Sequence, residues 1–422
     1  MSVGKRDAIV QRSPVFYGWI VWGVATLGYL ASSPGQSFTV SLFFERFIED
    51  LSLNRTTVSM LYSGGTLLAA GSLTLIGRWV DRVGSRLAST VIGALLALAL
   101  VFMSFVAGPL MLLAGFVLIR SLGQGSITLV SSNIIAQWFQ RRRGLAMGIT
   151  SFVYMLSQGL IVMGLTRLIS TVGWRTTWLV QAALVGVVVV PLMALLVRDH
   201  PEDVGLHPDG AADPVRDASL PGADAEVNLT LKQAMGTPIL WVFLLLQMLS
   251  AGWVTGLIIH QISLFEVVGH GPSVPVQTFS LAATVAAMFT LIAGPIVDRT
   301  KPQLVAAAQM LLLAGLLVLA TVMTTRPLTI LYGGLLGVFL GVWPVFDGVV
   351  WPNVFGRAHY GSIRGLVQTA GVAGSALGPV VFSLSADASG TYGVALWIGA
   401  GLALLIVAAS LIVRVPAAQA SG

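Results

Sequence analysis

The sequence predicts an all-α polytopic membrane protein with twelve transmembrane helices, arranged as two six-helix, pseudo-symmetric bundles. The 422-residue chain is 56% hydrophobic and only 9% charged, whereas roughly 25% of the residues in a soluble domain are charged. Apolar runs of about 20 residues, enough to cross a hydrocarbon core of roughly 30 Å, recur along nearly the whole chain. Polar landmarks of the first half also return in the second half.

The clearest landmark is the segment GRWVDRVGSR at residues 77–86, which lies between two long apolar runs and predicts a tight polar turn at a membrane surface. The segment GPIVDRTK at residues 294–301 repeats its Gly-x-x-x-Asp-Arg core, and the numbers of Asp298 and Asp81 differ by 217. Because the pattern occurs twice, we assign it to gating of the cytoplasmic side through arginines and helix N-termini rather than to a solvated turn. The predicted gating residues are Gly77, Asp81, Arg82, Gly84, Arg86, Asp298 and Arg299.

A second landmark, Arg143-Gly144-Leu145, returns as Arg364-Gly365-Leu366, and here the numbers differ by 221. Two separated landmarks therefore give nearly the same period, which indicates two similar halves. We predict a first bundle over residues 1–197, an acidic, proline-containing cytoplasmic linker over 198–236, and a second bundle over 237–422.

Six apolar segments make up the first half. Lys5, Arg6 and Arg12 precede the first segment, which is too long for the apolar part of a signal peptide and is interpreted as an uncleaved helix. Pro34-Gly35 should loosen the outer end of this helix. The predicted helices cover residues 16–37, 56–76, 87–106, 110–140, 145–169 and 173–197.

The composition changes sharply after the sixth helix, where aspartates and glutamates stand among prolines. These acids do not contradict a cytoplasmic position, because the rule that sets membrane orientation counts Lys and Arg and largely ignores Asp and Glu. Six further helices are predicted at residues 238–265, 276–293, 303–323, 328–355, 362–383 and 392–413.

The positions of the basic residues predict the orientation. With a cytoplasmic N-terminus and twelve helices, five of the 23 Lys and Arg lie outside and one lies within a helix, which leaves 17 in cytoplasmic segments. This asymmetry predicts a multi-pass protein of the cytoplasmic (inner) membrane with both termini in the cytoplasm. The five outside are Arg46, Arg55, Arg167, Arg175 and Arg326, and the one within a helix is Arg120.

Several functional classes lack their signatures in this sequence. Cysteine is absent, so a disulfide framework and a thiol-ligated metal are excluded. We find no nucleotide-binding glycine loop, no His-Glu-x-x-His and no nucleophile elbow. The sequence therefore predicts no enzyme activity, no cofactor, no metal site and no nucleic-acid partner, and any transport must draw on a gradient.

Two six-helix halves with a Gly-x-x-x-Asp-Arg turn after the second and eighth helices resemble the major facilitator superfamily over essentially the whole chain. Three segments are similar to the monocarboxylate transporters and the bacterial oxalate/formate antiporter relatives: Phe16-Tyr17-Gly18-Trp19, WFQRRRGLAMG at residues 138–148 and DHPEDVGLHPDG at residues 199–210. The resemblance implies a secondary active transporter.

One departure from that subfamily concerns its anion-binding residues. The resemblance implies a substrate-binding arginine in the eighth helix and, in oxalate exchangers, a lysine in the eleventh. Here residues 276–293 contain no basic residue, and Arg364 lies at the cytoplasmic entrance of the eleventh helix with no basic residue deeper. An anion would need another partner.

Ionisable residues inside the bilayer are functional candidates, because each costs roughly 2.5 to 3.5 kcal/mol on insertion scales. Arg120, near the midplane of the fourth helix, is either an anion or proton-relay partner or a structural arginine bonded to neighbouring backbone. Asp347, beside Pro344 in the tenth helix, is either a proton site or a cap for freed backbone N–H groups. His260 either binds substrate or is a satisfied structural histidine, and we favour the structural role.

Other polar residues could line a midplane cavity between the halves, although each can equally join neighbouring helices. Trp343 belongs either to an apolar cavity wall or to an interfacial belt, as do Trp22, Trp253 and Trp351. The candidate cavity residues are Tyr29, Gln36, Gln124, Ser131, Asn133, Gln158 and Gln247.

These observations predict a functional monomer that moves a small organic anion, a monocarboxylate, with a proton by alternating access. Arg120 would hold the charge of the anion and Asp347 would titrate. An exporter of an apolar or amphipathic compound is the main alternative, since it would not need the missing arginine of the eighth helix. A membrane sensor would need a soluble output domain, for which the linker and the termini are short.

Overall fold

The computed structural model describes residues 10, 13–210, 228–271 and 273–416. Lys5, Arg6, Arg12 and the linker acids after residue 210 lie outside the described residues. Every regular element in the described part of the chain is helical, which confirms the predicted all-α class. Eleven helices there are long and apolar enough to cross a membrane, and the first transmembrane helix is interrupted.

The interruption of the first helix falls where the sequence predicts it. Helix α2 (Gly18–Ala31) ends before the short 3₁₀ segment η1 (Ser33–Gly35), and the chain continues as α3 (Ser37–Val40), η2 (Ser41–Phe43) and α4 (Phe44–Leu51). Pro34 cannot donate a backbone hydrogen bond, so the helical ladder is lost there. The break leaves backbone carbonyls that need other donors, which matters for the site described below.

The rest of the first half contains five transmembrane helices, two of which include π-helical segments. The elements are α5 (Arg55–Val83), α6 (Ser85–Ser104), α7 (Pro109–Ile119), η3 (Arg120–Ile127), α8 (Thr128–Trp138), α9 (Arg143–Val172), α10 (Trp174–Ala183), η4 (Leu184–Val189) and α11 (Val190–Leu196). Segments η3 and η4 are the π-helical parts.

The described parts of the linker are short, and the second half again forms six transmembrane helices. The linker elements are η5 (Glu202–Val204), η6 (Pro208–Gly210) and α12 (Leu231–Met235). The second half consists of α13 (Pro238–Ile259), α14 (Gln261–Val267), α15 (Ser273–Arg299), α16 (Pro302–Val322), α17 (Arg326–Phe355), α18 (Tyr360–Ser389) and α19 (Gly393–Ile412).

The predicted polar turn at residues 77–86 is wrong in its extent. Helix α5 continues through Asp81 to Val83, and the chain turns only at Gly84, whose φ of 85° is a left-handed conformation that favours glycine. Helix α15 likewise runs on to Arg299. The helices can extend this far because the aspartate in each final turn bonds to another helix, as shown below, and does not face water.

The two halves align when residue numbers that differ by 217 are paired, a difference that we call the repeat offset. The fourth transmembrane helix, Pro109–Trp138, and α17, Arg326–Phe355, are related by the repeat offset at both ends, as are α9 and α18. The sequence landmark that pairs Arg143 with Arg364 is therefore wrong by four positions, about one helical turn. At the repeat offset the counterpart of Arg143 is Tyr360, and that of Arg364 is Met147.

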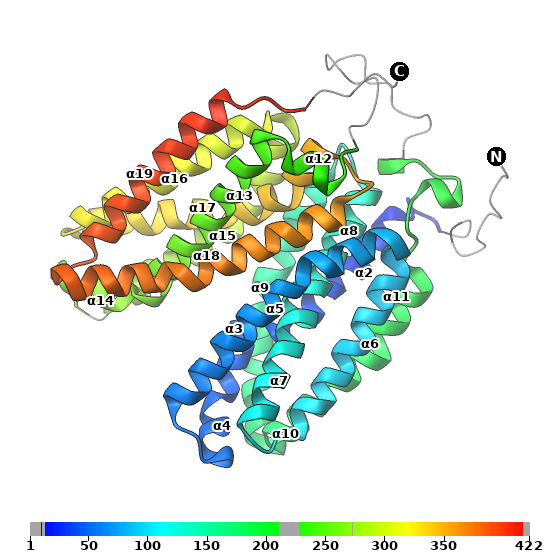
Figure 1. Ribbon diagram of the computed structural model, residues 1–422, viewed down its shortest axis with the longest axis horizontal. Coiled ribbons are helices and arrows are strands. Elements are labelled where there is room, and N and C mark those ends of the chain that lie inside the picture. Colours follow the sequence, from blue (N-terminus) through cyan, green and yellow to red (C-terminus); the bar gives the residue numbers. More distant parts are fainter. Residues whose placement is uncertain (1–9, 11–12, 211–227, 272, 417–422) are drawn as a thin grey trace.

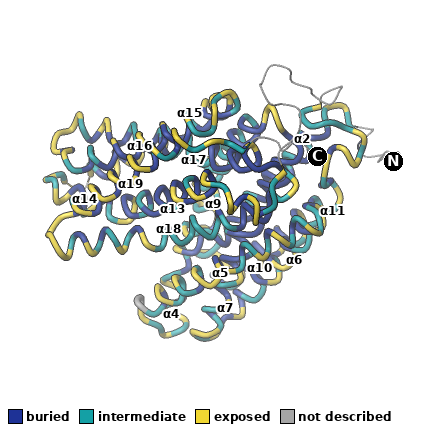
Figure 2. The backbone as a smooth tube through the Cα atoms, turned by 45° about the horizontal axis from the view of Figure 1, so that its top comes forward, coloured by how far each residue is buried: buried dark blue, intermediate teal, exposed yellow. Residues whose placement is uncertain are grey.

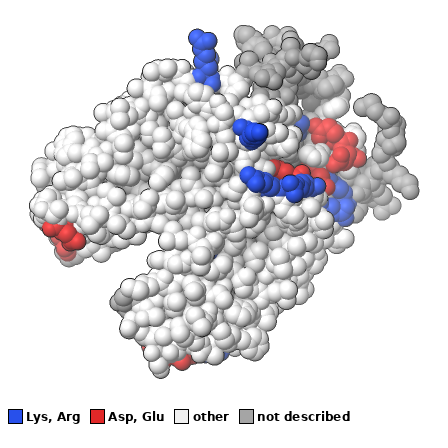
Figure 3. Space-filling view, in the orientation of Figure 1, with Lys and Arg blue, Asp and Glu red and all other residues white. Residues whose placement is uncertain are grey.

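The molecule has two arms that meet at one end and diverge at the other (Figure 1). Helices α2 to α11 form one arm and α13 to α19 the other. We call the end with Gly84, Asp209 and Lys301 the linker end, and the end with α4 and α14 the open end. Lys, Arg, Asp and Glu gather at the ends, and the surface is hollowed between the arms (Figure 3).

The outer faces of the helices are apolar. Exposed residues run along the outside of both arms, and buried residues lie between the helices and where the arms meet (Figure 2). Large hydrophobic side chains are among the exposed ones: Val187 on η4 is 74% exposed and Leu405 on α19 is 67% exposed. Such a surface is stable only against lipid, because it would expose a large apolar area to water.

Candidate functional site

Two aspartates join the arms at the linker end. Asp81 of α5 accepts hydrogen bonds from the backbone N–H groups of Gly361 and Ser362, both at 2.7 Å, at the start of α18. Asp298 of α15 accepts from Gly144 N at 2.7 Å, and from the next residue at 3.3 Å, at the start of α9. Each carboxylate therefore caps the positive N-terminus of a helix in the other arm.

Glycines make these caps possible, because they let the helix backbones touch. A Cβ atom at Gly77 would overlap the carbonyl of Gly361, and one at Gly294 would overlap the carbonyl of Gly144. Gly294 is the counterpart of Gly77 at the repeat offset, and Gly361 is the counterpart of Gly144. The two crossings are thus related by the internal symmetry of the chain.

The predicted gating arginines do not contact these carboxylates. Arg82 and Arg299 are exposed and make no hydrogen bond or ion pair to a residue that the structure describes. Arg86 donates from Nε to the Ala194 carbonyl at 2.8 Å, and its backbone N–H donates to Asp199. Gly84 packs against the same Asp199 carboxylate. The two aspartates therefore join the arms through helix N-termini, with the glycines allowing the close approach.

A polar contact adds to the joint. Arg357, after α17, donates from Nη1 to the Gln137 carbonyl at 2.7 Å, and Gln137 Nε2 donates to the Arg357 carbonyl at 2.9 Å. Arg357 Nη2 also pairs with Glu202 of the linker at 3.2 Å. Arg143 of α9 donates to Asn353 of α17. The linker end of the molecule is thus closed.

A buried ion pair lies further along the second arm, where α17 meets α18. Asp347 Oδ2 is 2.6 Å from Arg364 Nη2, and Trp351 Nε1 donates to Asp347 Oδ1 at 3.0 Å. The two charged residues are 9% and 6% exposed. The sequence predicts Arg364 at the cytoplasmic entrance of its helix, whereas the structure buries its side chain. Its side chain extends from the start of α18 into the protein.

Several polar groups surround this pair. Tyr29 of the first arm and Tyr360 of the second both lie within electrostatic range of Asp347 and Arg364. Arg364 Nε is buried and has no hydrogen-bond partner among the described residues. The predicted cavity residue Tyr29 of the first arm thus lies within electrostatic range of the ion pair in the second.

Arg120 is the other deeply buried charge, and only 6% of it is exposed. It begins the π-helical segment η3. Its Nε donates to Thr66 Oγ1 at 3.0 Å and its Nη1 to the Gly35 carbonyl at 2.9 Å, while its guanidinium carbon lies 5.0 Å from the centre of the Tyr62 ring. Arg120 therefore satisfies a carbonyl that the broken first helix leaves free. Its position at the start of a π-helical segment also fits a functional site, because π-helical turns are common there.

Part of the Arg120 guanidinium remains available. No carboxylate contacts it in the described part of the chain, its Nη2 has no hydrogen-bond partner there, and Nη2 is not sealed from solvent. The side chain lines a small hollow of about 20 Å³, room for about one water molecule, between the two arms. The residues that line it are Thr66, Ala69, Ala70, Leu73, Gln124, Gly125, Gln368 and Val372.

The hollow lies along the contact between α5 and α18. These helices touch at Gly77 and Gly361 near the linker end and again at Ala70 and Thr369, where Thr369 Oγ1 donates to the Ala70 carbonyl at 2.9 Å. Ala70 and Gln368, the neighbour of Thr369, both line the hollow. The predicted cavity residue Gln124 lies there with Arg120.

Three further candidates have partners inside one arm, whereas Ser131 Oγ is buried without a hydrogen-bond partner among the described residues. Gln247 Oε1 accepts from Trp343 Nε1 at 3.0 Å in the second arm, and Asn133 Oδ1 accepts from Gln137 at 3.2 Å in the first. His260 Nε2 lies 3.2 Å from the Pro379 carbonyl, and its ring stacks on Phe382. The structure thus gives His260 the protein partners that a structural histidine requires.

The arrangement of the chain matches a known transporter family. A sequence profile described as Major Facilitator Superfamily matches residues 25–357. The chain belongs to the Major Facilitator Superfamily. No curated protein matches the sequence. This facilitator is a multi-pass membrane protein, and its family and fold point to secondary transport.

Solved structures of other facilitators share the fold at low sequence identity. The proton:xylose symporter XylE has a TM-score of 0.70 and 15% identity, with 93% of this chain and 94% of XylE covered. The human organic anion transporter MFSD10 (TETRAN) has a TM-score of 0.65 and 15% identity, with 94% and 100% covered. FucP, in the outward conformation, has a TM-score of 0.64 and 13% identity, with 93% and 97% covered.

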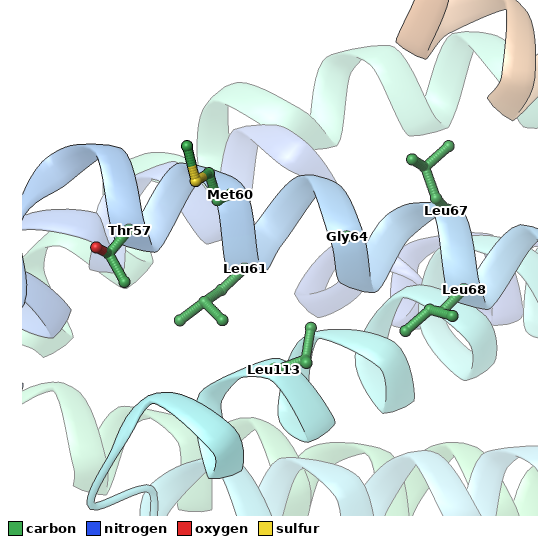
Figure 4. Close-up of a pocket in the computed structure, with 7 residues that line it drawn as sticks. All are labelled: Thr57, Met60, Leu61, Gly64, Leu67, Leu68 and Leu113. Carbon is green, nitrogen blue, oxygen red and sulfur yellow. The ribbon is translucent and has the colours of Figure 1, made fainter.

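One groove of this facilitator is lined mainly by apolar side chains. It lies between α5 and α7, and among the described residues that line it Thr57 contributes the one polar side chain (Figure 4). Leu61 and Leu68 lie on the side of α5 that faces Leu113 of α7, and Leu67 points away from it. The charged groups at the boundary between the arms are therefore the better candidates for an ionic substrate.

Replacing Asp347 by asparagine is expected to lower the stability of the facilitator strongly. The change leaves Arg364 buried and charged without its counterion, and breaking a buried pair costs about 3–5 kcal/mol. Thermal unfolding of the purified protein in detergent measures the effect. The double variant Asp347→Leu/Arg364→Met removes both charges, so it should be more stable than the single variant. Wild-type stability in Asp347→Asn would mean that the pair contributes nothing.

Proposed function

We propose that this facilitator is a symporter that moves a small organic anion, a monocarboxylate, across the cytoplasmic membrane together with a proton. The observation that carries the proposal is Arg120, a buried guanidinium with no carboxylate partner among the described residues, whose side chain lines the hollow between the arms. A buried charge is costly unless an opposite charge compensates it. A bound carboxylate supplies that charge.

The same hollow explains how this chain can differ from the carboxylate transporters that it resembles. This chain lacks the basic residue that those transporters carry in the eighth helix, because α15, its eighth transmembrane helix, contains no arginine before Arg299. Arg120 of the fourth helix takes over the charge in our proposal. Among the structural neighbours, MFSD10 is an organic anion transporter and XylE a proton:xylose symporter, so the fold serves both kinds of cargo.

The distribution of basic residues supports an outward-open orientation. Exposed Arg141, Arg142, Lys301 and Arg414 lie at the linker end, and basic residues concentrate on the cytoplasmic side of membrane proteins. The linker end is then cytoplasmic, with both termini on that side. The closed linker end and the hollowed open end correspond to access from outside, and we take the functional unit to be a monomer.

Asp347 is the group that we assign to the proton. Its Oδ2 lies 2.6 Å from Arg364 Nη2. In our proposal an anion competes with Asp347 for this guanidinium, and the released carboxylate accepts the proton. Arg364 Nε, which has no partner among the described residues, gives such an anion a point of contact. Proton uptake and substrate movement would be coupled in this way.

Uptake into proteoliposomes tests the proposal. The purified protein is reconstituted, and labelled lactate, pyruvate and further carboxylates are offered with and without an inward proton gradient. We expect accumulation that requires the gradient and that a protonophore abolishes. No uptake by a demonstrably folded protein, with export of hydrophobic compounds instead, would favour the alternative of an exporter of apolar or amphipathic molecules. Binding without any flux would indicate a sensor.

A further inference from the structure

We infer that the first arm carries a binding groove for a phospholipid of the surrounding bilayer, on the side that faces away from the second arm. The groove lies between α2, α9, α10 and η4 and has a volume of about 430 Å³, which is within the range of roughly 300–1,000 Å³ for ligand sites. All the residues that line it belong to the first arm, and Arg120 is not among them. The groove is therefore separate from the proposed anion site.

The groove opens toward the lipid. Gly148 of α9 approaches the Thr290 carbonyl of the second arm, and Gly164, which lines the groove, comes 16 residues later. At about 3.6 residues per turn these glycines lie about 160° apart around the helix, so the groove is on the opposite face of α9 from the second arm. Leu160 and Leu184 line the groove and are 66% and 59% exposed. In a bilayer these apolar side chains contact acyl chains.

The length of the groove and the position of its polar residues match one leaflet. Along α9 the groove runs from Ser157 to Leu168, a rise of about 16 Å, and half of the hydrocarbon core is about 15 Å thick. Ser33 and Gln181 lie at the end of the groove nearer the open end of the molecule. At the deeper end, the Ser157 hydroxyl donates to the Tyr154 carbonyl of its own helix. A lipid would therefore lie with its headgroup toward the open end.

Gln181 supplies a hydrogen-bond donor for the lipid. It lines the groove and is only 7% exposed, and its Nε2 is buried with no hydrogen-bond partner among the described residues. A buried amide N–H without an acceptor is unfavourable. The amide can turn about its last side-chain bond, because that torsion is broad, and so direct an N–H group into the groove. The ester carbonyl of a phospholipid, which joins the acyl chain to the headgroup, is an acceptor at this depth.

Arg167 is placed to bind the phosphate of the same lipid. It comes seven residues, about two helical turns, after Leu160 and therefore lies on the same face of α9. It is exposed, and its guanidinium makes no hydrogen bond or ion pair to a residue that the structure describes. Arginine side chains near helix ends extend toward the headgroups, and a guanidinium binds phosphate with paired hydrogen bonds. The groove and Arg167 together fit a phospholipid better than an uncharged hydrocarbon.

The internal symmetry shows which features are specific to this groove. At the repeat offset, eight of its residues correspond to residues that line a groove of about 450 Å³ between α13, α18 and α19, so the repeated packing produces a groove in each arm. Gln181, however, corresponds to Ile398, and Arg167 to Leu384. The π-helical segment η4 corresponds to part of the continuous α-helix α19, and π-helical segments are common at functional sites. The amide, the guanidinium and the π-helix therefore distinguish the first groove from the second.

Native mass spectrometry of the delipidated protein tests the inference with two lipids. Dioleoyl phosphatidylcholine carries ester carbonyls, and its diether analogue has the same headgroup and chain length without them. The wild-type protein should bind the diester about two- to tenfold more tightly, the contribution of one hydrogen bond, and Gln181→Leu should bind both lipids equally. Arg167→Ala should bind both about fivefold more weakly and keep the preference for the diester, because both lipids carry the phosphate.

A matched pair of bulky substitutions locates the site. Val188 and Leu405 are counterparts at the repeat offset, and each is exposed and lines the groove of its own arm. Val188→Trp fills the first groove and should abolish the preference for the diester. Leu405→Trp fills the second groove and should leave the preference unchanged. Thermal unfolding in detergent checks that both variants are folded.

The outcomes decide the inference without reference to transport. Equal binding of the two lipids by the wild-type protein, or a preference for the diester that survives in Gln181→Leu, would overturn it. Loss of the preference in Leu405→Trp but not in Val188→Trp would also overturn it, by assigning the lipid to the second arm. Because Arg120 does not line this groove, each of these results leaves the proposed anion site untouched.

Discussion

Replacing Arg120 by alanine is expected to abolish gradient-driven accumulation of the transported anion. The buried guanidinium is the charge that we assign to the anion, and removing one partner of a buried, hydrogen-bonded charge pair costs about 2–5 kcal/mol. A loss in the middle of this range lowers the affinity several hundred-fold. Uptake of labelled lactate into proteoliposomes, at concentrations below and above the wild-type half-saturation value, measures the change.

A second variant separates charge from geometry. Arg120→Lys keeps a positive charge but loses the planar fork that binds a carboxylate with two parallel hydrogen bonds. We expect it to retain weak uptake with a raised half-saturation concentration. If instead Arg120→Lys and Arg120→Ala were equally inactive and equally unstable, the structural role of Arg120 would account for both.

Arg120 also supports the broken first helix, so a structural control is needed. Thr66→Val removes the oxygen that accepts from Arg120 Nε at 3.0 Å and leaves the guanidinium charge in place. Its uptake should stay within a few-fold of the wild-type rate, because one neutral hydrogen bond contributes about 0.5–1.5 kcal/mol. Normal accumulation by a folded Arg120→Ala protein would rule out Arg120 as the anion partner.

The fold could be predicted from the sequence because its main determinants are local. Long apolar runs specify membrane helices, and the Pro34-Gly35 pair specifies the break in the first of them. Helix ends were predicted less well, since the whole segment at residues 77–86 looked like a turn, whereas α5 continues to Val83. Its actual partners, the N–H groups of Gly361 and Ser362, lie 280 and 281 residues away in the chain.

The ion pair of Asp347 and Arg364 could not be predicted for the same reason. Arg364 lies only a few residues after the start of α18, where a basic residue normally faces the aqueous side. Its burial depends on how α18 packs against α17, which no local pattern encodes. The misaligned repeat contributed as well, because pairing Arg143 with Arg364 suggested two equivalent surface residues.

The correct alignment of the halves offers a signal that sequence reasoning could have used. At the repeat offset, Asp347 corresponds to Val130 and Arg364 to Met147, while Arg120 corresponds to Gly337. The aspartates and glycines of the two helix crossings at the linker end, by contrast, are the same in both halves. Packing and capping residues therefore follow the internal symmetry, and the buried charges break it. Candidate site residues are found where one half has a charge and the other has a small or apolar residue.

Replacing Gly77 by valine is expected to shift the facilitator away from the arrangement with a closed linker end. A side chain at this position meets the carbonyl and backbone of Gly361, which cannot move unless the helices separate. Overpacking of this kind costs about 1–3 kcal/mol, which corresponds to roughly a 5- to 150-fold change in the equilibrium between the two arrangements. Spin labels on Glu49→Cys of α4 and Glu266→Cys of α14 lie at the open ends of different arms and report the distance between the arms by pulsed electron resonance. This distance should be shorter in Gly77→Val, and the uptake rate should fall.

Gly71 provides a matched control in the same helix. It is exposed, and a Cβ atom there would have no neighbour within 4 Å. Gly71→Val therefore changes the helix propensity of α5 in the same way without touching the other arm. The distance between its spin labels and its uptake rate should equal those of the wild type. An equal shift in both variants would trace the effect to helix propensity, and no shift in either would mean that the glycine contact does not hold the linker end closed. A shift confined to Gly77→Val would show that backbone contact between α5 and α18 sets the balance between the arrangements, because the Asp81 cap depends on that close approach.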